Sequence, residues 1–129
     1  MAQVKVYGRA GVLEPLRARL SDVVHAAAVE ALGLPADKRF HRFFPMTADD
    51  FPTPAGRTER YTVLEVVLFA GRSVATKKRF YALLIEGFAA ELGIEPLDLE
   101  VTLIETPRHD WAIRGLPGDE LDLPYRVAQ

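Results

Sequence analysis

The spacing of hydrophobic positions changes twice in the first third of the chain. Near the start, Val4 and Val6 alternate with polar residues, which is the period of a half-buried strand. From Leu13 to Leu32 apolar residues recur at steps of three and four, which predicts an amphipathic helix ending at Gly33. The stretch LPADKRFHRFF returns to extended character, and we expect it to stop at Pro45. The predicted order is strand, helix, strand.

The same order begins again after a connection that contains several prolines and acidic residues. YTVLEVVLF (61–69) is apolar on both faces, as in a central strand of a sheet. Ser73 is a suitable N-cap for a helix over Val74–Leu92, and Gly93 follows the predicted end of that helix. LDLEVTLIE then alternates as a strand from Leu97 to Glu105.

The two halves of the chain also resemble each other directly. LGLPADKRF and LGIEPLDLE share a helix end, a glycine and a strand entry, sixty positions apart. We therefore predict one α+β domain over 1–129, built from two βαβ units at about 1–45 and 60–106. Their parallel strands form a four-stranded sheet with both helices on one face. Residues 107–129 are expected to form an arm that packs on a neighbouring subunit.

The third predicted strand leaves one sheet face without a cover. Val63 and Val67 lie on one side of this strand and Leu64 and Leu68 on the other, and two helices cannot bury both sides. An oligomer in which open sheet faces pack together solves this problem, usually as a closed ring.

Composition narrows the class of function. The formal charge of −2 argues against a nucleic-acid-binding surface, while twelve of the sixteen basic residues are arginine, which suits recognition of small anions. The chain has no cysteine, which indicates a reducing cytoplasm, and no apolar run long enough for a membrane span. The three histidines lack metal-binding spacing and no glycine-rich phosphate loop is present, so no metal or other cofactor is predicted.

Four motifs, in this order and spacing, resemble the tautomerase superfamily. They are GLPADKRF, GRS leading into KKRFYALL, LGIEPLDLEV and DWAIRG. The most similar branch is the one that contains malonate semialdehyde decarboxylase. The resemblance implies a subunit of two βαβ units and assembly into a trimer.

The resemblance also implies a chemical role for the amino terminus. Members of this superfamily typically use an amino-terminal proline, exposed when the initiator methionine is removed, as general base or acid. Ala2 occupies that position here. Removal of Met1 leaves a free α-amine with an unperturbed pKa of about 8, which burial near a cation lowers. An ordinary chain end without a chemical role is the alternative interpretation.

Arginines hold the substrate carboxylate in this superfamily, and the resemblance assigns this role to Arg72. This residue precedes a helix N-terminus, where backbone N–H groups also favour an anion. A second arginine of the related branch is replaced by Ala70. Another arginine, from this subunit or a neighbour, must therefore complete the clamp. The candidates are Arg42, Arg57 and Arg114.

Two further residues are candidates for the pocket wall. Trp111 matches an aromatic wall residue of the family, although a core anchor is an equally good interpretation. His41 shares a strand face with Arg39, and either reaches the pocket or has a structural role. Lys38 stands where the related branch has an acid that activates water, which places decarboxylase activity in question.

Two functions from different classes stay open at this point. In the first, the protein is a cytoplasmic homotrimer of the tautomerase type that lacks the proline. It acts on a small 2-oxo acid or its enol through Ala2 and Arg72, as a tautomerase-like or lyase-like enzyme of low activity. In the second, the same trimer binds a small carboxylate without turnover or serves a structural purpose.

Overall fold

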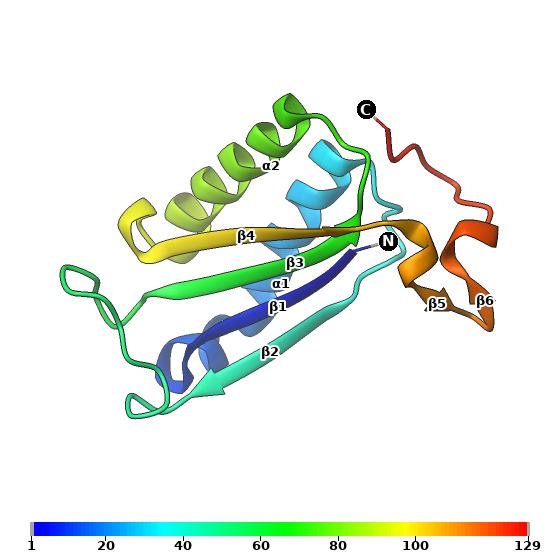
Figure 1. Ribbon diagram of the computed structural model, residues 1–129. Coiled ribbons are helices and arrows are strands. Elements are labelled where there is room, and N and C mark those ends of the chain that lie inside the picture. The colour runs from blue at the N-terminus through cyan, green and yellow to red at the C-terminus, as the bar shows by residue number, and fades with distance from the viewer. Residues whose placement is uncertain (1, 129) are drawn as a thin grey trace.

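The computed structural model describes residues 2–128, in which a mixed four-stranded sheet carries two long helices on one face (Figure 1). The strands are β1 (Ala2–Arg9), β2 (His41–Met46), β3 (Thr62–Phe69) and β4 (Leu99–Thr106). The helices are α1 (Ala10–Leu32) and α2 (Val74–Gly87), and α2 continues into one π-helical turn at Phe88–Leu92. No helix within 2–128 is long and apolar enough to cross a membrane.

The sheet has the strand order β2-β1-β3-β4. Each βαβ unit contributes a parallel pair, β1 with β2 and β3 with β4, and the two units meet through antiparallel β1 and β3. This arrangement confirms the predicted fold. Ala2 pairs with Leu68, so the beginning of β1 lies beside the end of β3, which pairs on its other side with the end of β4. The end of α1 and the beginning of α2 lie at this same end of the sheet, where β1 begins and β3 ends (Figure 1).

The core lies between the sheet and the helices. Val6 of β1 and Leu64 of β3 are fully buried and alternate with half-buried residues on the open face. Leu20 and Val24 of α1 and Phe80 of α2 close the core from the other side. The alternation predicted for β1 is therefore confirmed.

Both helical segments end on the glycines that the sequence indicated. Gly33 and Gly93 have φ of 68° and 65°, the left-handed conformation that glycine adopts without steric strain. Ser73 caps α2 by accepting a hydrogen bond from the N–H of Thr76.

Two predicted strand boundaries were wrong. Pro45 does not end β2 but lies inside it beside Gly8, which is allowed because β2 is an edge strand and needs no donor there. The fourth strand begins at Leu99 instead of Leu97, because Pro96–Asp98 forms a 3-10 turn. Asp98 is buried and accepts hydrogen bonds from Thr58 N and Oγ1.

The chain after β4 folds back on its own subunit. A short hairpin pairs β5 (Ala112–Ile113) with β6 (Leu116–Pro117). Leu121 is buried, and Val127 comes so close to Gly71 that a Cβ on Gly71 would lie 3.3 Å from its Cγ1. The predicted arm thus contacts the beginning of α2 in its own subunit, and its packing on a neighbouring subunit stays a prediction.

Candidate functional site

The beginning of β1 forms the floor of a small cavity of about 80 Å³. Ala2 is only 6% exposed and lies in the cavity wall. The other lining residues come from α1, the connection to β2, the β5–β6 hairpin and the C-terminal segment: Val4, His25, Ala28, Leu34, Pro35, Lys38, Phe40, His41, Arg114, Leu123, Pro124 and Tyr125. A space of this size holds several water molecules or one small organic molecule.

The charges around this cavity favour an anion. Lys38 and Arg114 line it from two different segments, and no Asp or Glu of residues 2–128 does so. Carboxylates are held by such cations, and the mostly apolar wall strengthens the attraction by excluding water.

A second, wider hollow lies on the open face of the sheet and shares Lys38, Phe40 and Arg114 with the first. It has a volume of about 450 Å³, and its wall includes Arg42 of β2 and Trp111. Three of the arginine and aromatic candidates from the sequence therefore gather around one end of β1.

Trp111 is held in place by polar and close steric contacts. Its indole N–H donates to Thr106 Oγ1 at 2.5 Å, and its ring lies edge-on to Phe69 at 5.0 Å between centroids. Gly118 N donates to the carbonyl oxygen of Trp111 at 2.7 Å. A Cβ at Gly118 would lie 2.2 Å from the carbonyl oxygen of Arg108, so only glycine fits there.

Arg114 is positioned by the tight turn between β5 and β6. Arg114 and Gly115 have φ of 53° and 79°, which is the two-residue turn that the twist of a hairpin favours. A residue with a side chain is uncommon in this left-handed region, and such outliers gather at functional sites.

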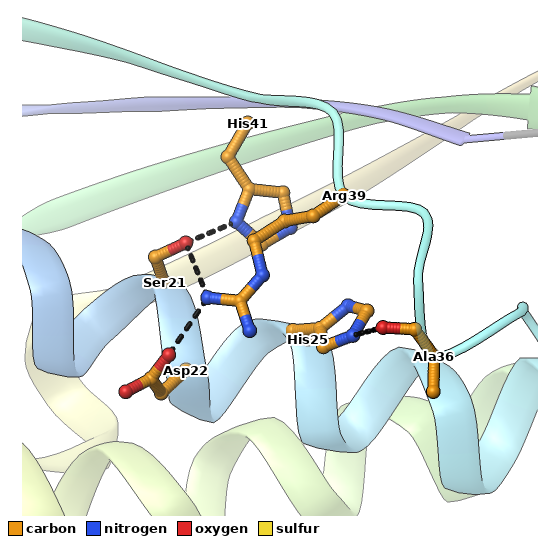
Figure 2. Close-up of polar contacts among 6 residues, drawn as sticks. All are labelled: Ser21, Asp22, His25, Ala36, Arg39 and His41. Atoms are coloured by element: carbon orange, nitrogen blue, oxygen red, sulfur yellow. Dashed lines mark hydrogen bonds and ion pairs between the residues drawn. The ribbon is translucent and has the colours of Figure 1, made fainter.

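His41, the first residue of β2, lines the cavity and belongs to a cluster of polar side chains from α1 and from the segment before β2 (Figure 2). Its Nδ1 lies 2.7 Å from Ser21 Oγ. Arg39 Nη1 donates to Ser21 Oγ at 3.3 Å and to Asp22 Oδ1 at 2.7 Å. Burial, with the charges of Arg39 and His25, lowers the pKa of His41 to about 4.

His25 of α1 is half-buried, lines the cavity and donates from Nε2 to the carbonyl oxygen of Ala36 at 2.8 Å (Figure 2). The contact joins the last turns of α1 to the loop that carries Lys38.

Arg72 and Arg57 lie outside both hollows. Arg72 is 5% exposed and donates from Nη2 to the carbonyl oxygen of Leu32 at 3.1 Å and from Nη1 to that of Phe69 at 3.5 Å. Burial lowers its pKa, and Glu105 opposes that shift. Arg57 forms an ion pair with Glu100 at 3.4 Å, at the opposite end of the sheet from Ala2.

Several wall residues were not predicted from the sequence. Lys38 was noted as a departure from the related branch but was not assigned to the site. Its place beside the matched RF dipeptide was the available signal. Leu123, Pro124 and Tyr125 gave no such signal, because only the return of the C-terminal segment brings them to the cavity.

The comparisons with known proteins agree with the fold and with the motifs. Residues 38–114 match the family model described as tautomerase enzyme. The probable tautomerase YrdN of Bacillus subtilis (strain 168) is 33% identical over 99 residues, which are 73% of this chain and 76% of that protein.

Solved structures show the same likeness. Malonate semialdehyde decarboxylase, solved in wild-type, mutant and inactivated forms, is 27% identical with a TM-score of 0.77 over 92% of this chain and 99% of that one. The F6 fused 4-OT wild-type asymmetric trimer is 28% identical with a TM-score of 0.78 over 91% of this chain and 96% of that one. The resemblance inferred from the motifs is confirmed, and the chain belongs to the tautomerase superfamily, in the family described as tautomerase enzyme.

Proposed function

We propose that this protein moves a proton on a small 2-oxo acid or its enol, with the α-amine of Ala2 as the base. One observation carries the proposal: Ala2 forms part of the wall of a small cavity lined by Lys38 and Arg114 and by no carboxylate of residues 2–128. Met1, whose removal would expose this amine, lies outside the described residues.

The surroundings of the cavity favour the basic form of the amine and the binding of a carboxylate. Burial and the nearby cations disfavour an ammonium ion, so both effects lower the pKa of the amine and favour its neutral, basic form. Lys38 and Arg114 bind the substrate carboxylate, and Arg114 can bind it with two parallel hydrogen bonds. The substrate is held with its acidic C–H group near the amine.

The absence of proline at position 2 reduces activity without removing the base. The mutant of malonate semialdehyde decarboxylase named in its structure replaces that protein's first residue, a proline, by alanine, the residue at position 2 of this chain. A primary amine keeps the lone pair but loses the ring that fixes its direction. We therefore propose tautomerisation of low activity. Lys38 in place of an acid does not support decarboxylation.

We further propose that the protein is a homotrimer. The fused 4-OT structures are trimers, and this chain shares their fold. A neighbouring subunit would cover the open sheet face and could bring Arg57 towards a pocket it does not reach in its own subunit.

A carboxylate-binding protein without turnover is the second candidate. The same two cations support it, and it needs no free amine. Catalysis requires a free amine at position 2, whereas binding without turnover does not. Both functions require the cation of Arg114.

The test compares tautomerisation of an enol 2-oxo acid by the wild type, Ala2→Pro, Arg114→Ala and Lys38→Ala, after mass spectrometry shows that Met1 is absent. We expect slow turnover by the wild type, faster turnover by Ala2→Pro, and a rise in KM of about tenfold for each cation variant. Turnover by neither the wild type nor Ala2→Pro, with pyruvate still bound, would favour the binding protein. A protein that binds neither a 2-oxo acid nor another small carboxylate would contradict both functions.

A further inference from the structure

A chain of hydrogen bonds runs through the polar cluster and ends on the imidazole of His41 (Figure 2). Asp22 holds the guanidinium of Arg39, which donates to the Ser21 oxygen. That oxygen in turn lies 2.7 Å from Nδ1 of His41. The three contacts connect an ion pair at the protein surface to the wall of the cavity.

The donors and acceptors in this cluster indicate where the proton of His41 lies. Arginine has donors only, so Ser21 Oγ accepts from Arg39, and its hydroxyl proton needs an acceptor of its own. Within residues 2–128, Nδ1 of His41 is the acceptor that Ser21 contacts. A neutral imidazole that accepts at Nδ1 carries its proton on Nε2.

The surroundings of His41 also keep the imidazole uncharged. The side chain is half-buried, the guanidinium of Arg39 is close, and the ring of His25 lies edge-on at 6.3 Å between centroids. Burial and these two neighbours lower the pKa of His41 to about 4, well below neutral pH. Lys38 and Arg114, which line the same cavity, add positive charge.

Nε2 of His41 is free to meet a ligand. It lies on the side of the ring away from Ser21 (Figure 2) and has no hydrogen-bond partner among the described residues. His41 pairs with Val4 across the sheet and shares the cavity wall with Ala2. A donor on Nε2 is therefore close to the position where the proposed base would act.

We propose that Ser21 and Arg39 are positioning residues that hold His41 as the Nε2–H tautomer, and that this N–H binds the carbonyl oxygen of the substrate 2-oxo acid. The inference rests on the proposed function for its substrate. The tautomer itself follows from the hydrogen bonds of the ligand-free protein.

In the reaction, the Ala2 amine takes a proton from C3 of the 2-oxo acid. The electrons of that C–H bond form the C2=C3 double bond, and the carbonyl π electrons move to the oxygen. The developing charge on this oxygen accepts a hydrogen bond from Nε2–H. The proton on the amine then passes to the oxygen, which completes the enol. A neutral donor in a small, mostly apolar cavity stabilises such an enolate without a change of its own charge.

The first measurement reads the tautomer of His41 by two-bond ¹H–¹⁵N NMR of the histidine side chains at pH 7. The chain has only three histidines, so His25→Gln and His109→Gln assign the spectrum. We expect the Nε2–H pattern for His41 in the wild type and in Ser21→Thr, and a mixture of tautomers in Ser21→Ala and Arg39→Ala. Arg79→Ala is the matched control, because Arg79 also pairs with a carboxylate of α1, Glu30, but lies outside the cluster.

The second measurement is kinetic. We expect His41→Ala to lower kcat about 100-fold, as loss of an oxyanion donor does. His41→Gln restores part of kcat, because its amide keeps an N–H donor. Ser21→Ala lowers kcat about tenfold with KM unchanged. His109→Ala, at an exposed histidine, leaves both constants at the wild-type values.

The outcomes separate this inference from the proposed function. An Nδ1–H tautomer or an imidazolium at pH 7 in an active protein overturns the inference alone. An Nε2–H tautomer whose Nε2 signal does not respond to bound pyruvate overturns the donor role. A wild type without turnover but with a pyruvate-shifted Nε2 signal contradicts the proposed catalysis and supports the donor. A protein that neither binds nor turns over a 2-oxo acid overturns both the donor role and the proposed function.

Discussion

At the scale of single residues, the sequence suggested one role for Arg72 and the structure shows contacts of another kind. The guanidinium spans the carbonyl oxygens at the end of α1 and the end of β3, and its Nε has no partner among residues 2–128. These contacts join the first βαβ unit to the second. Arg72 therefore connects two elements within one subunit, whatever a ligand does.

Arg72→Ala should lower the free energy of unfolding by about 1–3 kcal/mol, because it removes a buried donor from two carbonyl oxygens. Urea denaturation followed by circular dichroism measures the change. Arg79→Ala, at an exposed arginine, should change stability by no more than about 0.5 kcal/mol. An Arg72→Ala protein with wild-type stability but no affinity for a 2-oxo acid would support the substrate-binding role predicted for Arg72.

The lowered pKa of His41 predicts how the stability of the protein depends on pH. Its pKa of about 4 in the folded state lies below the ordinary value of 6.5, so the unfolded state binds more protons between these two values. Stability should be highest above pH 6.5, fall by up to about 3 kcal/mol as the pH decreases to 4, and lose nothing more from this group below that. Urea denaturation at several pH values measures the slope.

The control for this pH dependence is a pair of histidine variants. His41→Gln should flatten the slope between pH 4 and 6.5, whereas His109→Gln should keep it, since His109 is exposed. A His41→Gln protein with the full wild-type slope would show that other groups cause the pH dependence.

At the scale of elements, the β5–β6 hairpin places a cation at the cost of backbone strain. Arg114 has a positive φ at a turn position where glycine or asparagine is usual. Arg114 lines both hollows. The conformation of this turn thus lowers the stability of the protein and places a positive charge at the site.

Arg114→Gly should raise the free energy of unfolding by up to about 1 kcal/mol, because the strained conformation is relieved. It should also weaken pyruvate binding about tenfold through loss of the cation. Calorimetry measures stability and titration measures affinity. Asparagine tolerates the same backbone conformation, so Arg114→Asn should lose as much affinity for pyruvate as Arg114→Gly. Unchanged pyruvate binding in both variants would exclude Arg114 from the site.

At the scale of the whole molecule, the sheet has one covered face and one open face. On the open face Phe44 of β2 and Ile104 of β4 are 40% and 41% exposed, and Tyr7 stacks on Phe44. Apolar side chains spread over a sheet face in this way need a partner surface.

Ile104→Glu should convert the proposed trimer to monomers at micromolar concentration, because it places a charge in the apolar interface. Light scattering coupled to size-exclusion chromatography measures the mass. Val74→Glu is the control, since Val74 is 65% exposed but lies at the start of α2, away from the open face. A wild type that elutes as a monomer would contradict the trimer, and a trimeric Ile104→Glu would place the interface elsewhere.

Most of the fold could be predicted because its signals are local. The alternation in β1, the three- and four-residue spacing in α1, and the glycines at 33 and 93 each depend on a few neighbouring residues. The errors came where a distant partner decides the outcome. Pro45 is allowed only because β2 has no neighbour on its outer edge, and the start of β4 depends on the bonds between Asp98 and Thr58.

The candidate site was less predictable for the same reason. The resemblance led to Ala2, Arg114 was one of three candidates for the second arginine, and both line the cavity. Lys38 and the C-terminal residues join them only because the chain returns to the beginning of β1. A lysine or leucine in a loop has no local pattern that shows what it will face.

By itself, the sequence determined the order of the elements, the duplication and the superfamily, because periodicity, caps and motifs are properties of short stretches. Only the tertiary structure decided that Arg72 joins two elements, that Lys38 and Arg114 line one cavity with Ala2, and that Nδ1 of His41 contacts Ser21. The physical reason is that burial, charge pairing and hydrogen-bond direction depend on residues far apart in the chain.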